Sequence, residues 1–291
     1  MTTPYTRLIS VEQLQSLVTR RVPLRIFDVS FDLADSAQAD AMFLHKHIAG
    51  ATLAHLGRDL SAHLASAPAA SGGRHPLPTR DALAAWLTRA GLANGMQAVV
   101  YDRHSVKFCG RLWWMLKWAG HDAVAVLDGG LQAWEAAGGA TESGPALPPA
   151  PAHPPFALGA PLRRMVDTGH VLRHLGEPDQ TLIDARDAAR YRGETEPLDP
   201  VAGHIPGALN RPFTENFAAD GRYKPPAQLK AEFDALLAGR APASVVCYCG
   251  SGASAPANAL ALELAGYPPA PVYAGSWSQW CRTPGLPCAK G

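Results

Sequence analysis

The sequence predicts an α/β protein made of two tandem copies of one domain, each with a central, mostly parallel sheet flanked by helices. Three observations support this fold class. Short motifs recur in the same order in both halves of the chain, a proline-rich segment separates the halves, and β-branched runs alternate with stretches of helical spacing. The chain has 291 residues, which is enough for two domains of ordinary size.

The internal repeat has four landmarks in each half. The paired landmarks are residues 24–29 and 182–186, 47–51 and 204–208, 99–101 and 245–247, and 126–130 and 272–276. Asp28 and Asp184 in the first pair lie 156 residues apart, and His47 and His204 in the second pair lie 157 apart, whereas the third and fourth pairs lie 146 apart. The N-terminal half therefore holds about eleven extra residues, near 61–75, and this Ala-, Ser- and Gly-rich stretch predicts a loop. His47 and His204 occupy matching places, which favours a structural role in a turn.

The proline-rich segment sets the predicted domain boundaries. We expect a first domain over residues 5–140, a linker over 141–160 and a second domain over 161–291. Six of the fourteen residues in 142–155 are proline. Such a segment cannot continue a helix and tends to be extended and stiff, so we interpret it as a semi-rigid strap.

The second half shows the alternation of elements most clearly. Residues 182–184, 245–248 and 271–273 are short strand-like runs, and residues 227–237 and 255–265 have helical spacing. This order predicts a parallel sheet with helices on both faces. Ligands of such sheets bind at the carboxyl ends of the strands.

Composition limits the classes of function. The chain is 47% hydrophobic and 18% charged, with a formal net charge of +1, so it has no global field for nucleic acid or an anionic membrane. No apolar run reaches signal-peptide or transmembrane length, and we expect a soluble cytoplasmic protein. Five cysteines, an odd count, argue against a disulfide scaffold and leave room for a working thiol.

The segment 244–266 contains the candidate nucleophile and the loop that surrounds it. An apolar strand ends at Tyr248, Cys249 follows, and a Gly- and Ser-rich loop leads into a helix that has Pro256 in its first turn. We expect Gly250 and Gly252 to supply positive φ angles, and Ser251 or Ser254 to cap the helix. Loop amides and the helix N-terminus would then lower the pKa of the Cys249 thiol and stabilise an anionic persulfide.

Nearly the whole chain resembles the tandem-domain sulfurtransferases of the rhodanese superfamily, which use thiosulfate or 3-mercaptopyruvate. The motifs that carry the resemblance are residues 27–33, 47–51, 73–78, 113–116, 127–130, 190–194, 203–208, 249–255 and 275–280. Each is short, but their order and spacing are highly specific.

The resemblance implies a rhodanese fold in each half, a catalytic second domain and a non-catalytic first domain that lines one side of the active site. The nucleophile is implied to be Cys249, because Arg103 stands at the matching place of the first half. In the family an arginine six residues after the strand-ending aspartate contacts the anionic substrate, and here it is Arg190. Arg186 is a further candidate, although a local ion pair that supports the fold is the favoured role. The implied substrate-binding residues are Arg190, Gly250, Ser251, Gly252, Ala253, Ser254 and Arg186.

The neutral loop after Cys249 is similar to that of the mercaptopyruvate-preferring members, in which the hydroxyl matching Ser251 helps to activate the bound thiol. His75 matches the histidine linked to that serine. Three places depart from the mercaptopyruvate pattern, namely Gly57 for an aspartate, Leu198 for a second arginine and Ala274 for an aspartate. The sequence therefore leaves the choice between thiosulfate and 3-mercaptopyruvate open.

Other interpretations of the cysteines are weaker. A related phosphatase would need an arginine six residues after Cys249, and Ala255 stands there. A zinc site built from Cys247, Cys249, Cys281 and Cys288 lacks a usual ligand spacing, so we expect neither a metal nor another cofactor. The alternative that stays open is a persulfide carrier or sensor that delivers sulfur to a protein partner without turnover.

The predicted mechanism is a ping-pong transfer. The Cys249 thiolate attacks the outer sulfur of a small anionic donor, sulfite or pyruvate leaves, and a persulfide remains. Cyanide, a small thiol or thioredoxin then accepts the sulfur. Neither a nucleic acid nor a membrane partner is expected.

Overall fold

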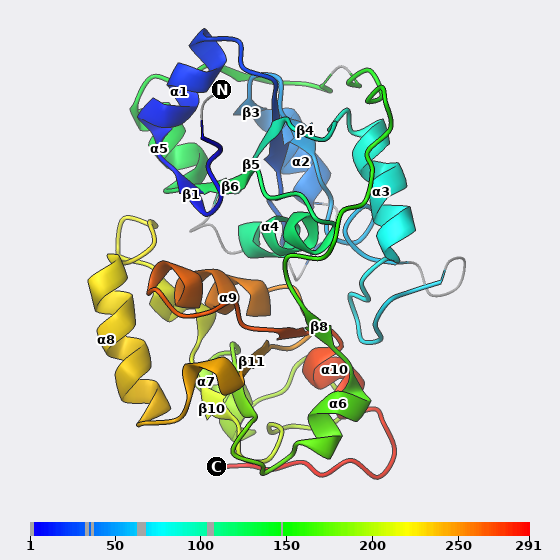
Figure 1. Ribbon diagram of the computed structural model, residues 1–291, viewed down its shortest axis with the longest axis vertical. Helices are drawn as coiled ribbons and strands as arrows, with labels where there is room; N and C mark the ends of the chain where they lie inside the picture. The colour runs from blue at the N-terminus through cyan, green and yellow to red at the C-terminus, as the bar shows by residue number, and fades with distance from the viewer. Residues whose placement is uncertain (1–2, 33–34, 36–37, 63–67, 104–107, 147) are drawn as a thin grey trace. The chain divides into compact units, whose positions relative to one another are not determined.

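The computed structural model describes residues 3–32, 35, 38–62, 68–103, 108–146 and 148–291 (Figure 1). These residues form two compact units. The first unit consists of the described residues of Met1–Ala62, Pro78–Leu162 and Ala219–Tyr223, and the second consists of those of His63–Leu77, Arg163–Ala218 and Lys224–Gly291. Each unit therefore includes a short segment from the other half of the sequence, and we call residues 68–77 of the second unit the arm.

The first unit is built on a five-stranded parallel sheet of order β1-β6-β5-β2-β4. The strands are β1 (Leu8–Ile9), β2 (Leu24–Asp28), β4 (Thr52–Leu53), β5 (Gln97–Tyr101) and β6 (Val124–Leu127), with an antiparallel pair of β3 (His47–Ile48) and β7 (Thr141–Glu142) beside them. The helices are α1 (Val11–Thr19), α2 (Gln38–His45), α3 (Arg80–Arg89), α4 (Cys109–Trp118) and α5 (Gly130–Ala136).

The second unit has a five-stranded parallel sheet of order β10-β9-β11-β12-β8. The strands are β8 (Met165–Val166), β9 (Thr181–Asp184), β10 (Leu209–Asn210), β11 (Val245–Tyr248) and β12 (Val272–Tyr273). The helices are α6 (Thr168–Arg173), α7 (Ala188–Arg192), η1 (Phe213–Asn216), α8 (Pro226–Leu237), η2 (Pro242–Ser244), α9 (Ala255–Leu264) and α10 (Ser276–Trp280). The predicted α/β class with two similar domains is confirmed.

The repeat extends from the motifs to the register of the strands. Matching strands have the same order in both sheets, so that β2 and β5 of the first unit correspond to β9 and β11 of the second. Tyr101 lies opposite Asp28, and Tyr248 lies opposite Asp184. The Tyr101 hydroxyl accepts the Ile48 N–H at 3.0 Å, while the second unit uses the Tyr248 hydroxyl in the same way. Both units thus share a hydrogen bond from a backbone N–H to the hydroxyl of a strand tyrosine.

The two histidines of the repeat are structural, as predicted. His47 stacks on Phe43 with ring centroids 3.8 Å apart, and its Nδ1 lies 2.8 Å from the Phe43 carbonyl oxygen. His204 stacks on Tyr191 at 3.9 Å, and its Nδ1 lies 2.8 Å from the Tyr191 carbonyl oxygen. Each imidazole is thus held by one aromatic residue through both its ring and its backbone.

Strand β11 and helix α9 position the candidate site. All four residues of β11 are buried, and nine of the ten residues of α9 are buried, because the helix is apolar on nearly every side. A β-branched run between two strands of a parallel sheet is the expected sequence for such a central strand. Pro256 lies in the first turn of α9, as predicted, where the missing N–H costs little.

The linker region, residues 141–160, is part of the first unit. Beyond β7 it lacks helix and strand among its described residues, in agreement with its proline content. The N–H groups of Ala152 and Phe156 donate to the backbone and side-chain oxygens of Thr88, at 2.8 and 3.0 Å. The predicted loop near residues 61–75 is also free of helices and strands where it is described; residues 63–67 lie outside the described residues.

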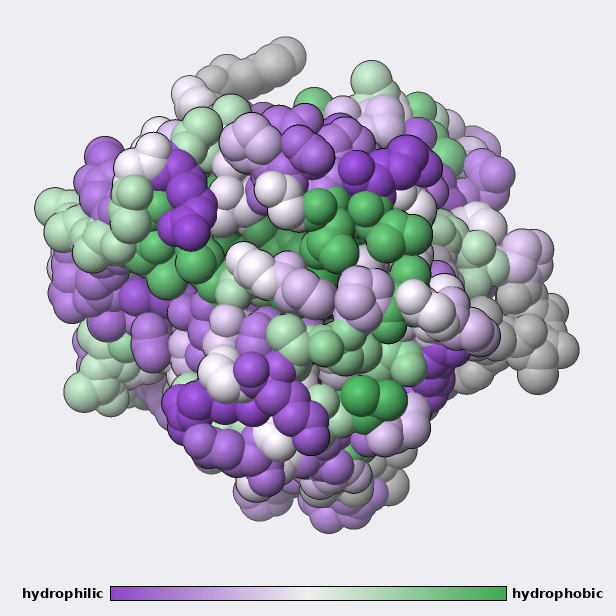
Figure 2. All heavy atoms as spheres, turned by 90° about the horizontal axis from the view of Figure 1, so that it is seen from below, coloured by the Kyte–Doolittle hydropathy of each residue, from purple (hydrophilic) through white to green (hydrophobic). Residues whose placement is uncertain are grey.

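The surface is chemically mixed. Figure 2 shows hydrophobic areas that are interrupted by hydrophilic ones on the face that it presents. The large hydrophobic side chains that the described residues leave exposed are Val18, Leu44, Leu162, Leu172 and Leu198. No helix within the described part of the chain has both the length and the apolar character needed to span a bilayer.

Candidate active site

Cys249 lies at the carboxyl end of the central strand of the second unit, directly after β11. Its side chain is almost fully buried, and its Sγ accepts the Gly252 N–H at 3.1 Å. Gly252 has a left-handed φ of 79°, which a residue with a side chain adopts reluctantly. The expectation of a second positive φ at Gly250 was wrong, since one left-handed residue is enough to turn the loop. Ala253, the next residue of the loop, is buried.

The electrostatic environment of Cys249 favours the thiolate. Burial raises the pKa of its thiol, but hydrogen bonds from the Ser254 hydroxyl and from the backbone N–H groups of Ser254, Ser251 and Ala255 outweigh burial and lower the pKa below its ordinary value. Cys247, two residues earlier on β11, has no such donors, and burial raises its pKa to about 12. The loop therefore distinguishes two buried cysteines by hydrogen bonding alone.

The prediction that Ser251 or Ser254 caps helix α9 was wrong. Ser254 stands at the N-cap position, but its hydroxyl forms no capping hydrogen bond and instead acts on the Cys249 sulfur. Ser251 is engaged elsewhere, as described below. The side chain that would ordinarily satisfy a helix N-terminus is thus used to stabilise a negative charge in front of it.

Ser276, at the start of α10, supports the loop from the other side. It is fully buried and has a left-handed φ of 54°, which is uncommon for a residue that is not glycine. Its hydroxyl accepts the Cys249 N–H at 3.1 Å and lies 3.9 Å from the Cys249 Sγ. A strained residue that touches a buried thiol is a mark of a functional site. Sequence reasoning missed Ser276, because nothing in its motif reveals the backbone angle.

Arg190 lies close to Gly250, the first residue of the loop after Cys249. It belongs to the short helix α7, and the helix is capped by Asp187. Its guanidinium bonds both oxygens of Glu196, with the shortest contact at 2.7 Å. A β-carbon placed on Gly250 would lie 3.4 Å from Arg190 Nη1, so the cation faces the residue that follows the nucleophile.

Arg74, on the arm, provides a second cation that sequence reasoning missed. The same point above Gly250 lies 3.2 Å from Arg74 Nη2. The arm is held on the second unit by the Arg74 N–H, which donates to the Ser278 hydroxyl at 3.0 Å, and by the Gly72 N–H, which donates to Gln279 at 3.2 Å. The position of Arg74 next to His75 was the available signal, but the sequence does not show which unit the arm joins.

Asp199 connects these cations. Its carboxylate is fully buried, and it forms ion pairs with Arg74, with Arg190 at 3.7 Å and with Arg282 at 2.7 Å. A carboxylate without solvent needs such partners, because burial of an unpaired charge is very costly. Asp199 thus fixes three guanidinium groups at one place and lowers their mutual repulsion.

Arg186 supports the fold, which is the role that the sequence favoured. Its side chain is 1% exposed and bonds Asp184 Oδ2 at 2.6 Å and the Gly203 carbonyl oxygen at 2.7 Å. Its guanidinium also lies 5.0 Å from the ring centroid of Trp277, a cation–π distance. With all its faces occupied, Arg186 has little capacity left for a substrate.

The arm also brings an imidazole to the loop. His75 Nδ1 lies 2.7 Å from the Ser251 hydroxyl oxygen, and Ser251 is buried. The link that the sequence inferred between these two residues is therefore present in the geometry. A hydroxyl paired with an imidazole, beside a thiol, can transfer a proton.

The three departures from the family pattern have different surroundings. Gly57 donates its N–H to His55 Nδ1 at 3.1 Å in the first unit. Leu198 is 43% exposed, and its N–H donates to Glu196, so the backbone there serves the arginine network without a charged side chain. Ala274 is buried, and nothing in the structure explains the substitution.

The first unit has no thiol at the place of Cys249, and Arg103 occupies the pocket. Its guanidinium bonds Asp28 Oδ2 at 2.6 Å and the Lys46 carbonyl oxygen at 2.6 Å, and its Nε bonds the Ser30 hydroxyl at 2.9 Å. These partners match Asp184 and Gly203, the partners of Arg186 in the second unit. Each unit thus has a guanidinium group that bonds the strand-ending aspartate and the carbonyl oxygen just before the repeated histidine. The arginine that carries this group stands at a different position of the repeat in each unit.

The other thiols do not join the site. No group of three or more His, Cys, Asp or Glu side chains within the described ranges is arranged to hold a metal ion. Burial raises the pKa of Cys281 to about 11 and raises the pKa of Cys288. Cys109, in the first unit, is buried, and its thiol is strongly biased towards the neutral form by burial, which raises its pKa.

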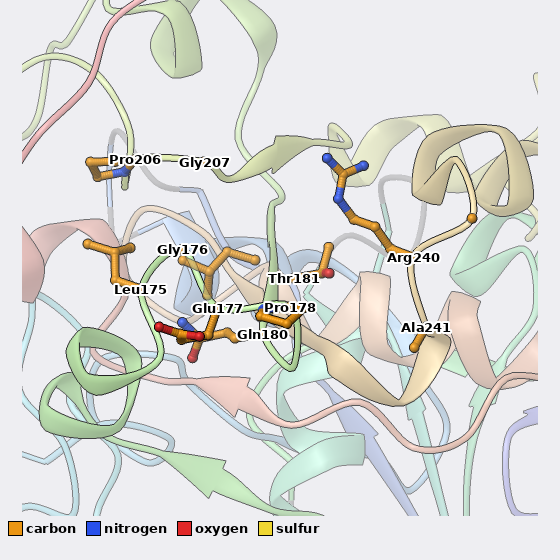
Figure 3. A pocket seen from close by; sticks show the side chains of 12 residues that line it. Leu175, Gly176, Glu177, Pro178, Gln180, Thr181, Pro206, Gly207, Arg240 and Ala241 are labelled. Carbon is orange, nitrogen blue, oxygen red and sulfur yellow. The ribbon is translucent and has the colours of Figure 1, made fainter.

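A separate cavity of about 550 Å³ lies in the second unit around the start of β9 (Figure 3). Leu175, Glu177, Gln180, Pro206 and Arg240 are among its lining residues. Because parallel strands start at the opposite edge from Cys249, this cavity belongs to the amino end of the sheet. We do not assign it to the candidate active site.

Known proteins resemble this chain over nearly its whole length. A probable 3-mercaptopyruvate sulfurtransferase from Pseudomonas aeruginosa is 43% identical over 98% of this chain and 98% of its own length. A putative thiosulfate sulfurtransferase, SseB, from Mycobacterium tuberculosis is 36% identical and covers 98% of this chain and 97% of its own length. Among solved structures, the 3-mercaptopyruvate sulfotransferase SseA from Escherichia coli has a TM-score of 0.78 and 29% identity, over 94% of this chain and 100% of its own.

Residues 10–137 and 167–283 each match the family described as the rhodanese-like domain. The chain belongs to this family and carries two such domains. Within the family it is a tandem-domain sulfurtransferase, a transferase of the EC 2.8.1 type, as the sequence predicted.

Proposed function

We propose that the chain moves sulfane sulfur from a small anionic donor to a thiol or cyanide acceptor through a persulfide on Cys249. The observation that carries this proposal is the buried Cys249 sulfur, which accepts the Gly252 N–H at 3.1 Å and has a lowered pKa. Thiolate is the reactive form of cysteine, and the same donors stabilise an anionic persulfide.

Two guanidinium groups hold the donor in this proposal. Arg190 and Arg74 both lie within 3.5 Å of the place where a β-carbon on Gly250 would stand, so the two guanidinium groups are close enough together for a single carboxylate or sulfonate to contact both. Arginine suits this role because its planar N–H groups bind such anions in pairs. Arg74 takes the place of the second arginine that the chain lacks at Leu198.

The first half-reaction breaks one bond to sulfur and forms another. The Cys249 thiolate attacks the donor sulfur, and the electron pair of the broken bond leaves with sulfite from thiosulfate or with the enolate of pyruvate from 3-mercaptopyruvate. The enolate then takes a proton, while the donor thiol loses one. Sulfite needs no proton at this step, so only the mercaptopyruvate reaction uses a proton relay.

We propose that 3-mercaptopyruvate is the preferred donor. Ser251 and His75, 2.7 Å apart, provide the relay from the donor thiol to the enolate. The loop itself carries no positive side chain that would favour a dianion such as thiosulfate. The second half-reaction is attack by an acceptor thiolate or cyanide on the outer persulfide sulfur, with Cys249 thiolate as the leaving group.

Two measurements test the function and the donor. Protein treated with 3-mercaptopyruvate should gain about 32 Da, one sulfur atom, on the peptide that contains Cys249, and Cys249→Ser should gain nothing. The ratio of kcat/KM for 3-mercaptopyruvate to that for thiosulfate, measured as thiocyanate formation from cyanide, should exceed unity. A persulfide without turnover would favour a carrier that delivers sulfur to a protein, and a gain on Cys247 would refute our choice of nucleophile.

A further inference from the structure

A second pocket, of about 290 Å³, adjoins Arg74 in the second unit. Its lining residues are Gly73, Arg74, Ser278, Gln279, Arg282 and Thr283. Arg190 and Cys249 do not line it. The pocket is therefore distinct from the space above Gly250, but it shares the Arg74 side chain with that space.

Arg282 gives this pocket its charge. Its Nη1 donates to Asp199 Oδ1 at 2.7 Å and to the Ser278 carbonyl oxygen at 2.9 Å. Within the described part of the chain both of its hydrogen bonds use Nη1, so Nε and Nη2 remain available, and the side chain is 45% exposed. Nη1 thus fixes the guanidinium group in place, while Nε and Nη2 can donate to a ligand.

The charged side chains that line the pocket are positive. They are Arg74 and Arg282, and both pair with the same buried carboxylate, that of Asp199. The pocket lies at the small end of the range for ligand sites, so it suits a small organic acid better than a nucleotide.

We propose that this pocket holds the carboxylate of a small thiol acceptor, with Arg282 as the residue that binds it. The inference rests on the proposed function. The donor anion is assigned to the space beside Gly250, where Arg190 and Arg74 come together, whereas the second pocket lacks Arg190. A second anion site next to the first lets an acidic acceptor bind without using the arginine pair that holds the donor.

The acceptor step is balanced without an oxidant. The acceptor thiolate attacks the outer sulfur of the Cys249 persulfide, the sulfur–sulfur bond of the persulfide breaks, and its electron pair stays on Cys249 as thiolate. The acceptor leaves as a persulfide. Arg282 touches only the carboxylate, so it sets the affinity for the acceptor and not the chemistry at sulfur.

The test compares two acceptors of similar length, one anionic and one neutral, 3-mercaptopropionate and 3-mercaptopropan-1-ol. For the unaltered protein we expect a KM for the acid about tenfold below that for the alcohol, since a charge-assisted bond to Arg282 is worth about this factor. Arg282→Gln should raise the KM of the acid about tenfold and leave the KM values of the alcohol, of cyanide and of the donor unchanged. Arg282→Lys should restore part of the loss, and Arg240→Gln, at the cavity beyond the amino end of the sheet, is the matched control.

Equal KM values for acid and alcohol in the unaltered protein would overturn the proposal, as would an equal effect of Arg282→Gln on both thiols. Propionate gives a further readout: it should compete with 3-mercaptopropionate, and Arg282→Gln should weaken this competition. If no persulfide forms on Cys249 with any donor, the proposed function fails. If the persulfide forms and cyanide accepts its sulfur while Arg282→Gln has no effect on the acid, only the acceptor pocket is lost.

Discussion

Removal of the guanidinium of Arg103 should destabilise the first unit without altering the chemistry at Cys249. Asp28 is a fully buried carboxylate, and the side chain of Arg103 is only 9% exposed. Loss of one partner of a buried ion pair costs about 3–5 kcal/mol, because the other charge is left without compensation. Since Asp28 still accepts the Ser30 N–H at 2.8 Å, we expect Arg103→Ala to cost near the lower end, about 3 kcal/mol.

This loss is measurable by differential scanning calorimetry. For a unit of this size each kcal/mol lowers the midpoint by about 2–4 °C, so Arg103→Ala should lower it by about 6–12 °C. Arg58→Ala is the matched control, since Arg58 forms an exposed pair with Asp40 that is worth at most about 1 kcal/mol. Asp28→Asn in the Arg103→Ala background should recover part of the loss, because it removes the uncompensated charge.

Two results would refute the reasoning. A midpoint equal to that of Arg58→Ala would show that the pair contributes no more than a surface pair. A rise in the donor KM of the folded Arg103→Ala protein would show that Arg103 acts on the substrate, contrary to its enclosure by Asp28, Ser30 and Lys46.

Three further predictions concern the second unit. Ser254→Ala removes a hydroxyl that lowers the pKa of Cys249; the acid limb of the kcat/KM–pH profile should move to higher pH, since less thiolate is present at any pH below the pKa, while the plateau stays. An unmoved limb would exclude this role. His75→Ala should lower kcat/KM for 3-mercaptopyruvate by about 100-fold but change that for thiosulfate less than about threefold; equal losses would contradict the proton relay. Gly203→Ala should cost about 2–3 kcal/mol in urea unfolding, because φ is +124° and the added carbon would meet the Ala289 carbonyl oxygen.

The fold could be predicted from the sequence because the repeat consists of short motifs of neighbouring residues. Strand β11 was predicted over its exact range, and α8 and α9 within one residue of theirs, since β-branched runs and helical spacing are local signals. The place of Cys249 at a strand end followed from the same pattern. Arg190 was singled out through the family resemblance, which implies a substrate-binding arginine six residues after Asp184.

The rest of the site depends on contacts that no local pattern encodes. Arg74 and Asp199 are 125 residues apart and meet only because the arm joins the second unit. Ser276 contributes through a backbone angle, and Ser254 through the direction of its hydroxyl. The sequence predicted Ser254 as a helix cap, which the structure corrects, and assigned Ser276 no role in the site.

The second half of the sequence does not by itself contain every residue of the candidate site, because the arm comes from the first half. A fragment that starts after Leu162 retains Cys249 and its loop but loses the imidazole bonded to Ser251 and one of the two cations over Gly250. Cutting the chain at the linker would therefore separate the arm from the unit to which it belongs. An exchange of C-terminal halves between such proteins would have to include residues 68–77, because these residues belong to the second unit.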